Sequence, residues 1–385
     1  MSGDRPYRVA IVGAGVIGLF TAYHIARRGG GPVLVVDRGF LSSGASGRNG
    51  GGVRQQWQTR ATVRLARESV GAYRRFATEF GYNPWFRQTG YLFLAEDEAA
   101  RERLRPVHDL VRSEGLPSRW LDAAEVARAV PGIRPGAAVG GTFLGSDGTL
   151  YPFPVLWGLA EACRALGVDL RTGTEALGVD RRDGRITGLW TDRGRVAAET
   201  VVNAAGGWSR EFSLRCGLDP PNRPTRHEIL ATEPLKPFLD PMVVRASDGL
   251  YFSQTMRGEI VGGISPVGPA AEPNGMGSSA GFLGRMARAL VGLLPGLAGV
   301  GVLRAWSGFY DDTPDGMPIL GEDPRCPGLV HANGLGGHGV MLAPAVGDRV
   351  ARIVLGEPSG LDPGEFGPDR FADGTRRTTE ALALG

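Results

Sequence analysis

The pattern of hydrophobic positions in the first 40 residues predicts a βαβ unit. An apolar run at 7–12 is followed by a glycine-rich turn at 13–18, a stretch of helical periodicity to about residue 28, and a second apolar run at 32–37. Short apolar runs that flank such a stretch are typical of two parallel strands joined by a helix. A polar, glycine-rich loop at 42–52 separates this unit from the next predicted helix.

The pattern changes near residue 82. Before it, apolar residues at helical spacing predict a helix over 62–80 that packs one face inward. After it, predicted strands at 91–95 and 139–144 flank a helix at 96–113. We therefore expect the first domain to be interrupted by an inserted segment.

Two further groups of elements follow the insertion. The first continues the βαβ pattern, with a helix at 154–166, a strand at 168–171, a strand pair that turns at Asp183 and a strand at 200–203. The second contains short apolar runs without crossover helices, which favour antiparallel strands, and it precedes a last strand and a closing helix. Its predicted elements cover residues 226–232, 250–254, 259–263, 282–294 (a helix), 328–332 and 339–355 (the closing helix).

Length and composition narrow the class of protein. A chain of 385 residues is too long for one ordinary core, which favours two domains. The net charge is only +3 and Lys236 is the one lysine, so we expect no nucleic-acid or membrane-surface partner. Scattered cysteines predict no metal site and no disulfide framework, and no apolar run is long enough to span a membrane. We expect a cytoplasmic protein, and the sequence is compatible with an oligomer.

The turn after the first strand carries the residues of a dinucleotide site. Gly13, Gly15 and Gly18 form the pattern GxGxxG between a strand and a helix, where backbone can approach a pyrophosphate and the helix N-terminus supplies free N–H groups. Asp37 ends the second strand about 20 residues further on, where an acid can hold ribose hydroxyls. Glycines that only cap a helix would not need this acid, so we prefer a dinucleotide site.

Four further motifs indicate which dinucleotide it is. They are SGASGRNGGGVR at 43–54, NAAGGWS at 203–209, an Arg-x-Trp-x-Gly element at 304–308 that leads to TPDGMPILG at 313–321, and GLGGHG at 334–339. With these motifs the chain resembles, over nearly its whole length, the amine-oxidising FAD family that contains D-amino acid oxidase, glycine oxidase and sarcosine oxidase. The likeness is strongest to the β-type subunits of multimeric sarcosine oxidase and proline dehydrogenase, which carry a similar Gly-Arg-Asn segment followed by an arginine.

The resemblance implies a two-domain α/β fold. A Rossmann-like FAD-binding domain would be assembled from residues 1–81, 147–217 and 318–385. An inserted antiparallel-sheet domain that binds substrate would be formed by residues 82–146 and 218–317. The active site is then expected between the two domains.

The resemblance also implies which residues hold FAD. Small residues after the third parallel strand leave room where the cofactor crosses, and glycines before the last helix let its N–H groups and dipole face the flavin side on which negative charge grows on reduction. Ala176 is expected to contact adenine through its backbone. The complete set of expected FAD contacts is Gly13, Gly15, Val16, Ile17, Gly18, Asp37, Arg38, Ser43, Ala45, Ser46, Arg48, Asn49, Gly50, Gly51, Ala176, Ala204, Ala205, Gly206, Trp208, Gly308, Pro318, Gly336, Gly337, His338, Gly339, Val340 and Met341.

Covalent attachment of the flavin is not expected. Some relatives tether it to a cysteine near the element that contains Arg304, or to a histidine near the glycine-rich loop. Ser307, Gly308 and Phe309 provide no cysteine, and residues 48–57 contain no histidine. The sequence therefore predicts non-covalent FAD.

Arg54, Tyr251 and His338 are the predicted active-site residues. Arg54 corresponds to a family arginine near the flavin ring and could bind a substrate carboxylate through two hydrogen bonds. The alternative is that Arg54 is a solvent-exposed surface charge. Tyr251 resembles an active-site aromatic residue of relatives, the alternative being core packing. His338 is expected to orient backbone rather than to move protons. Weaker candidates are Trp57, His227, Arg304 and Tyr310.

The predicted reaction is oxidation of the C–N bond of an amine or amino acid to an imine, with hydride transfer to flavin N5. N-methylated, secondary and D-amino acids form the expected substrate class. The alternatives are a dehydrogenase subunit that passes electrons to a partner, a biosynthetic tailoring enzyme that acts on a larger amine or reduces an imine, and a structural flavin-holding protein, which the retained Arg54 disfavours. Monomeric oxidases of the family place a lysine near the flavin, but the corresponding strand at 258–263 has none, so oxygen is expected to be a poor acceptor.

Overall fold

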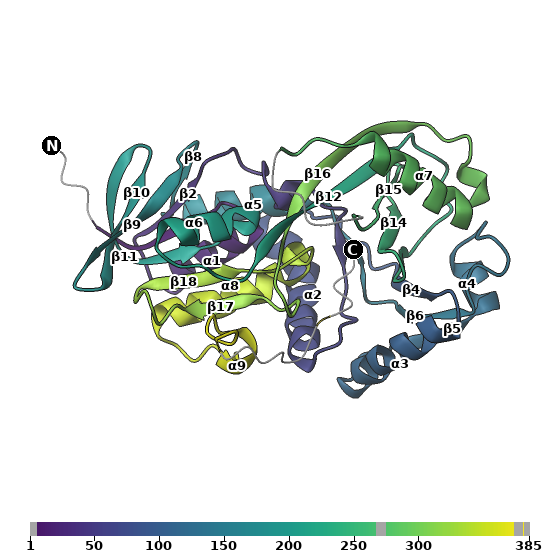
Figure 1. The fold of residues 1–385 in the computed structure, drawn as a ribbon, viewed down its shortest axis with the longest axis horizontal. Helices are drawn as coiled ribbons and strands as arrows, with labels where there is room; N and C mark the ends of the chain where they lie inside the picture. The colour runs from purple at the N-terminus through teal and green to yellow at the C-terminus, as the bar shows by residue number, and fades with distance from the viewer. Residues whose placement is uncertain (1–5, 267–274, 373–379, 381–385) are drawn as a thin grey trace.

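The computed structural model describes residues 6–266, 275–372 and 380, which form two units that lie side by side along the long axis of the molecule (Figure 1). In this part of the chain each unit is built on one eight-stranded sheet. The helix α2 (Arg60–Phe80) lies between the units (Figure 1). A mixed α/β fold with two sheets confirms the predicted fold class.

The first sheet has a parallel centre. β1 (Tyr7–Val12) pairs in parallel with β2 (Val33–Asp37) and with β11 (Gly194–Asn203). β17 is an antiparallel edge strand, and a ribbon of β9 and β10 continues from β11. The carboxyl ends of the parallel strands meet at one edge of the sheet, where ligands bind in such folds. The remaining strands are β8 (Asp169–Thr172), β9 (Ala176–Arg182), β10 (Arg185–Thr191), β17 (Ile319–Glu322) and β18 (Leu329–Asn333).

Helices cover both faces of this sheet, which explains why its central strands are apolar throughout. Val9 and Ile11 belong to the hydrophobic cluster that contains α1 (Val16–Arg27) and α8 (Gly339–Leu355), whereas Ala10 and Val12 belong to the cluster on the other face, with Phe212 of α6. α5 (Pro152–Ala165) packs beside α1, and α6 spans Ser209–Arg215.

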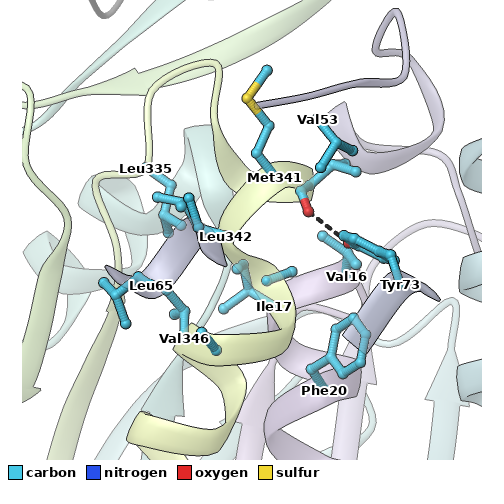
Figure 2. Packing of buried hydrophobic residues seen from close by; sticks show 14 of the residues in the cluster. Val16, Ile17, Phe20, Val53, Leu65, Tyr73, Leu335, Met341, Leu342 and Val346 are labelled. Carbon is cyan, nitrogen blue, oxygen red and sulfur yellow. Dashed lines mark hydrogen bonds between the residues drawn. The ribbon is translucent and has the colours of Figure 1, made fainter. Parts of the chain in front are cut away.

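α1 and α8 cross closely, and Figure 2 shows their contact. Phe20 of α1 lies beside Gly347 of α8, where a Cβ atom would come within 2.4 Å of the Phe20 Cβ. Tyr73 of α2 donates a hydrogen bond of 2.5 Å to the carbonyl oxygen of Val340, in the first turn of α8. The position of the α8 N-terminus is therefore set by two neighbouring helices.

The second sheet is antiparallel except at one pair. β13 and β4 run in parallel, and this pair joins the strands contributed by the first insertion to those contributed by the second. The short runs predicted as antiparallel strands at 226–232, 250–254 and 259–263 do pair in that way. The order across the sheet is β16 (Val302–Asp312), β12 (Arg223–Thr232), β15 (Ile260–Gly263), β14 (Leu250–Gln254), β13 (Met242–Arg245), β4 (Tyr91–Ala95), β6 (Gly140–Leu144) and β5 (Arg119–Asp122).

One hydrophobic cluster runs through both units. It contains Val9 and Val35 of the first sheet together with Tyr91 and Val244 of the second. These sheet memberships support our proposed division into two domains, whose bounds stay a prediction.

The elements not yet named are β3 (Gly52–Val53), β7 (Gly148–Thr149), α3 (Glu98–Ser113), α4 (Ala123–Ala129), α7 (Ala280–Leu293), α9 (Pro363–Phe366) and three 3₁₀ turns (Ala45–Gly47, Gly206–Trp208, Pro295–Leu297).

Three negative findings apply to the described residues alone. Cys163, Cys216 and Cys326 are buried and unbonded to one another. The described residues as a whole contain no cluster of side chains able to hold a metal ion. None of their helices combines the length and apolar character needed to cross a membrane.

Candidate functional site

A cavity of about 560 Å³ lies where the two sheets meet. Its walls come from the turn between β1 and α1, the loop after β2, the turn after β11 and the N-terminus of α8. The second sheet contributes residues of β12, β13, β14 and β16. The cavity thus connects the dinucleotide motif to the sheet predicted to bind substrate.

The three glycines of the first turn have different surroundings. A Cβ atom on Gly13 would lie 2.3 Å from the carbonyl oxygen of Ala204, and one on Gly18 would lie 1.9 Å from the carbonyl oxygen of Gly13. A Cβ atom on Gly15 would meet only the Ser46 hydroxyl, at 3.2 Å. Gly13 and Gly18 are therefore needed for packing, whereas Gly15 leaves open space in the cavity.

The acid at the end of β2 shapes the same turn. Asp37 accepts hydrogen bonds from the backbone N–H of Ala14 and of Gly39, both at 2.8 Å, and it lines the cavity. Beside it the guanidinium of Arg38 lies over the Trp208 ring, 4.4 Å from the ring centroid, and both side chains face the cavity. This end combines an acid, a cation and an aromatic face, a set that suits ribose and a purine base.

The loop after β2 is held by its own polar side chains. Ser46 accepts a hydrogen bond of 3.0 Å from the N–H of Val16, so its hydroxyl touches the first turn of α1. Arg48 donates to the carbonyl oxygens of Ser43 (2.8 Å) and Ser307 (3.2 Å). Asn49 donates to the carbonyl oxygen of Ser46 at 2.7 Å. These bonds fix a loop whose glycines leave its cavity face open.

The turn before α8 completes the wall. Gly336 has a φ of +51°, and its N–H donates to the carbonyl oxygen of Asp311 at 2.9 Å. Tyr310 stands against Gly337, where a Cβ atom would lie 2.4 Å from the Tyr310 Cζ. Because Gly337 and Gly339 line the cavity, the positive end of the helix dipole faces it.

Most of the residues expected to hold FAD line this cavity. The exceptions are Gly18, which packs against Gly13, together with Pro318 and His338. Their contact with the cofactor stays a prediction. The lining members of the expected set are Gly13, Gly15, Val16, Ile17, Asp37, Arg38, Ser43, Ala45, Ser46, Arg48, Asn49, Gly50, Gly51, Ala176, Ala204, Ala205, Gly206, Trp208, Gly308, Gly336, Gly337, Gly339, Val340 and Met341.

The far end of the cavity is aromatic and uncharged. The rings of His227 and Tyr310 stack with centroids 3.6 Å apart and an interplanar angle of 14°. Burial lowers the pKa of His227 to about 4 and raises the pKa of both Tyr251 and Tyr310, whose hydroxyls bond to each other. Near neutral pH these walls offer hydrogen bonds but no charge.

Tyr251 lies beside the loop expected to contact the flavin. A Cβ atom on Gly50 would be 3.3 Å from the Tyr251 ring. Ile229 and Met242 also line this end, and the sequence analysis singled out neither of them. Because side chains alternate along a strand, Ile229 could have been predicted to face the same side of β12 as His227. β13 was not predicted, so nothing in the sequence indicated that Met242 would line the cavity.

The structure places Arg54 behind the cavity wall. Its side chain is fully buried and is not among the lining residues. The guanidinium lies 3.8 Å from the centroid of the Trp57 ring and donates a hydrogen bond of 2.9 Å to the carbonyl oxygen of Gln56. To reach a substrate it would have to leave these contacts, and its role as a carboxylate anchor stays a prediction.

His338 lies next to Arg54 rather than in the cavity. Its Nε2 is 3.4 Å from an Arg54 Nη2, and its ring meets the Trp57 ring edge to face at 4.6 Å. Burial, and secondly the charge of Arg54, lower the pKa of His338 well below its usual range, so the imidazole is neutral. Arg304, another candidate, is exposed and lies over the Trp306 ring.

Comparisons with known proteins agree with this architecture. The profile of the family described as "DAO: FAD dependent oxidoreductase" matches residues 8–353. Sarcosine oxidase subunit beta of Rhodobacter capsulatus is 29% identical over 99% of this chain and 92% of that protein. Glycine oxidase of Pseudomonas putida is 30% identical over 94% of this chain and 98% of that protein. The crystal structure of L-proline dehydrogenase from P. horikoshii superposes on this chain with a TM-score of 0.91. The superposition covers 97% of this chain and 100% of that chain, and the two sequences are 29% identical.

Proposed function

Because the chain belongs to the DAO family of FAD-dependent oxidoreductases, we propose that it takes up a small amine or amino acid at the aromatic end of the cavity. The protein is an FAD-dependent oxidoreductase that acts on the C–N bond of amines or amino acids. One observation carries the proposal: a single cavity runs from the GxGxxG turn to the walls formed by His227, Tyr251 and Tyr310.

The residues present suit FAD. Thr174 lines the cavity, and its buried hydroxyl has no hydrogen-bond partner among the described residues, which leaves it available to a bound group. Gly15 leaves the first turn of α1 open, and as the N-cap residue it has no side chain that could cap the helix; among the described residues, Ser46 bonds the N–H of Val16. We propose that Gly15 and Ser46 border the pyrophosphate and that Gly337 and Gly339 border the flavin, which would supply the hydride acceptor. The bond between protein and FAD is proposed to be non-covalent.

The aromatic end is proposed to hold the substrate as a free amine. An uncharged wall disfavours an ammonium group by desolvation, and oxidation of the C–N bond needs the nitrogen lone pair. Neutral His227 can accept a hydrogen bond from the amine, and since the hydroxyls of Tyr251 and Tyr310 bond to each other, one of the two keeps a proton to donate to a carboxylate. The proposed substrates are N-methylated, secondary and D-amino acids.

A second candidate is a dehydrogenase that delivers electrons to a partner protein instead of oxygen. Two kinds of relative support it: L-proline dehydrogenase is a dehydrogenase by name, and sarcosine oxidase subunit beta and hydrogen cyanide synthase subunit HcnC are named as subunits. An assembly with further subunits and a cytoplasmic location are parts of this proposal.

An anaerobic screen tests the substrate class. The yellow protein is mixed under nitrogen with single amines and amino acids, and bleaching of the flavin absorbance is recorded. We expect bleaching by a secondary, N-methylated or D-amino acid. Bleaching only by large amines without a carboxylate would favour the biosynthetic alternative, and no bleaching by any amine would contradict the proposal.

A further inference from the structure

We propose that Arg54 is a positioning residue that fixes the His338 ring and, through it, the glycine turn before α8. This role differs from the carboxylate anchor expected from the sequence. It rests on the proposed cofactor site, but it concerns this chain's own contacts.

Side chains from two distant segments of the chain form one buried stack. Trp57 contacts both Arg54, whose guanidinium lies 3.8 Å from its ring centroid, and His338, whose ring meets it edge to face at 4.6 Å, and Arg54 also contacts His338 directly. The indole N–H of Trp57 donates to the carbonyl oxygen of Arg54 at 3.1 Å. Arg54 and Trp57 are both fully buried, and His338 is 2% exposed. The stack therefore has little freedom to move.

The guanidinium defines the tautomer of His338. An arginine side chain has only donors, so the His338 Nε2 at 3.4 Å must be the acceptor. The ring is neutral, so its single proton is on Nδ1. At 3.4 Å this contact is long, but the edge-to-face contact with Trp57 holds the ring at the same site.

Control of this ring matters because the turn has no other polar side chain. His338 is the N-cap residue of α8 and stands between Gly337 and Gly339, which both line the cavity. Its N–H donates to the carbonyl oxygen of Leu335 and its carbonyl accepts from Leu342. A fixed imidazole thus helps to fix the backbone N–H groups that face the cavity, together with the bond from Gly336 to Asp311 and the contact of Tyr310 with Gly337.

The test uses Arg54→Met, which removes the donors at similar length, and Arg54→Lys, which keeps the charge but loses the fork. FAD dissociation is measured by diluting the holoenzyme and following flavin fluorescence. We expect about tenfold to hundredfold weaker binding in Arg54→Met and a smaller loss in Arg54→Lys. The matched control is Arg74→Met, on the exposed face of α2, which should bind FAD as the wild type does.

Two further readouts separate positioning from general damage. With only five histidines, nitrogen NMR of ¹⁵N-histidine protein can follow His338, and its Nδ1-protonated pattern should become a mixture of tautomers in Arg54→Met. In a double-mutant cycle with His338→Gln, the second change should add little to the first. Both measurements need no substrate, so they do not depend on the proposed reaction.

The proposal is overturned by an unchanged tautomer pattern together with additive losses in the cycle. It is also overturned if FAD affinity is unchanged while an amino acid, but not its amide, becomes a poorer substrate. That second result would return Arg54 to the role of carboxylate anchor. If Arg54→Met does not fold, Arg54→Lys with the same two readouts decides the matter.

Discussion

Gly15 can be distinguished from its two neighbouring glycines by substitution. Its φ of −72° and ψ of 176° suit any residue, and the only nearby atom is the Ser46 hydroxyl. Gly15→Leu should therefore fold but purify colourless, because its side chain fills the expected pyrophosphate path. Flavin absorbance and circular dichroism measure the two properties. Gly13→Ala is the contrast: its Cβ atom would overlap backbone, so it should lose stability as well as colour. A yellow Gly15→Leu protein would remove this turn from the cofactor site.

The flavin should be released by acid. Neither Gly308 nor the loop at 48–57 provides the cysteine or histidine by which some relatives tether it. Precipitation with trichloroacetic acid should therefore leave the yellow colour in the supernatant, where its absorbance is compared with that of the intact protein. Colour that stays in the washed pellet would show a covalent bond.

At the residue scale, the sequence predicted the site correctly where all the residues concerned lie within one short segment of the chain. The glycine spacing and Asp37 are local signals, and Gly13, Gly15 and Asp37 line the cavity. The stack joins Arg54 and Trp57 to His338, which is far from them in the chain, and no periodicity reports that distant side chains meet. The same holds for the stacking of His227 on Tyr310.

At the scale of elements, Asp311 in β16 connects three segments. Its carboxylate accepts hydrogen bonds from Ser209 (2.8 Å), Asn222 (2.5 Å) and the N–H of Gly334 (2.7 Å). Asp311→Asn puts a donor where an acceptor is needed, so the free energy of unfolding should fall by about 1–3 kcal/mol. Urea unfolding of the holoenzyme measures it, and Asp240→Asn, whose side chain is 82% exposed, is the control. An unchanged midpoint would show that these bonds do not stabilise the fold.

The pKa of Asp311 determines how Asp311→Asn should change the pH dependence of the free energy of unfolding. Burial raises the pKa of Asp311 from 3.8 to about 6, so between these values the folded chain holds a proton that the unfolded chain has lost. Its contribution to the free energy of unfolding then falls by about 1.4 kcal/mol per pH unit as pH rises through this window. Asp311→Asn should make the pH profile flatter between pH 4 and about 6. Parallel profiles of the two proteins would contradict this expectation.

Regular elements were predicted where one periodicity persists. The closing helix was predicted at 339–355, the bounds that α8 has, because its apolar face is continuous. β16 was recognised only as a motif, since its first residues are exposed, including the apolar Val302 and Leu303, and its burial alternates only from Trp306 onward. β13 is four residues long and follows a proline-rich stretch, so its pattern was too short to predict a strand.

At the scale of the whole molecule, the arginines and the lysine that the structure describes near the cavity are exposed elsewhere or have partners of their own. Lys236 is exposed away from the lining, and Arg257 is exposed and paired with Glu259 at 2.8 Å. Arg304 lies over Trp306 on the surface. The lining arginines Arg38, Arg48 and Arg215 contact Trp208, backbone carbonyls and acidic side chains. The arrangement of charge therefore favours an acceptor other than oxygen.

The last prediction is that oxygen reoxidises the reduced enzyme slowly. A fixed positive charge beside the reduced flavin favours electron transfer to oxygen, because it stabilises the superoxide anion in a site of low dielectric constant. Arg54 is a buried cation that contacts His338 in the α8 turn, but it does not line the cavity, and the acids Asp147 and Glu380 lie close enough to act on its charge. In stopped flow, enzyme reduced by its substrate under nitrogen should react at least about tenfold faster with an artificial dye than with air-saturated buffer. Lys236→Met should leave both rates unchanged. Reoxidation by air fast enough to support turnover would instead make the protein an oxidase that releases hydrogen peroxide.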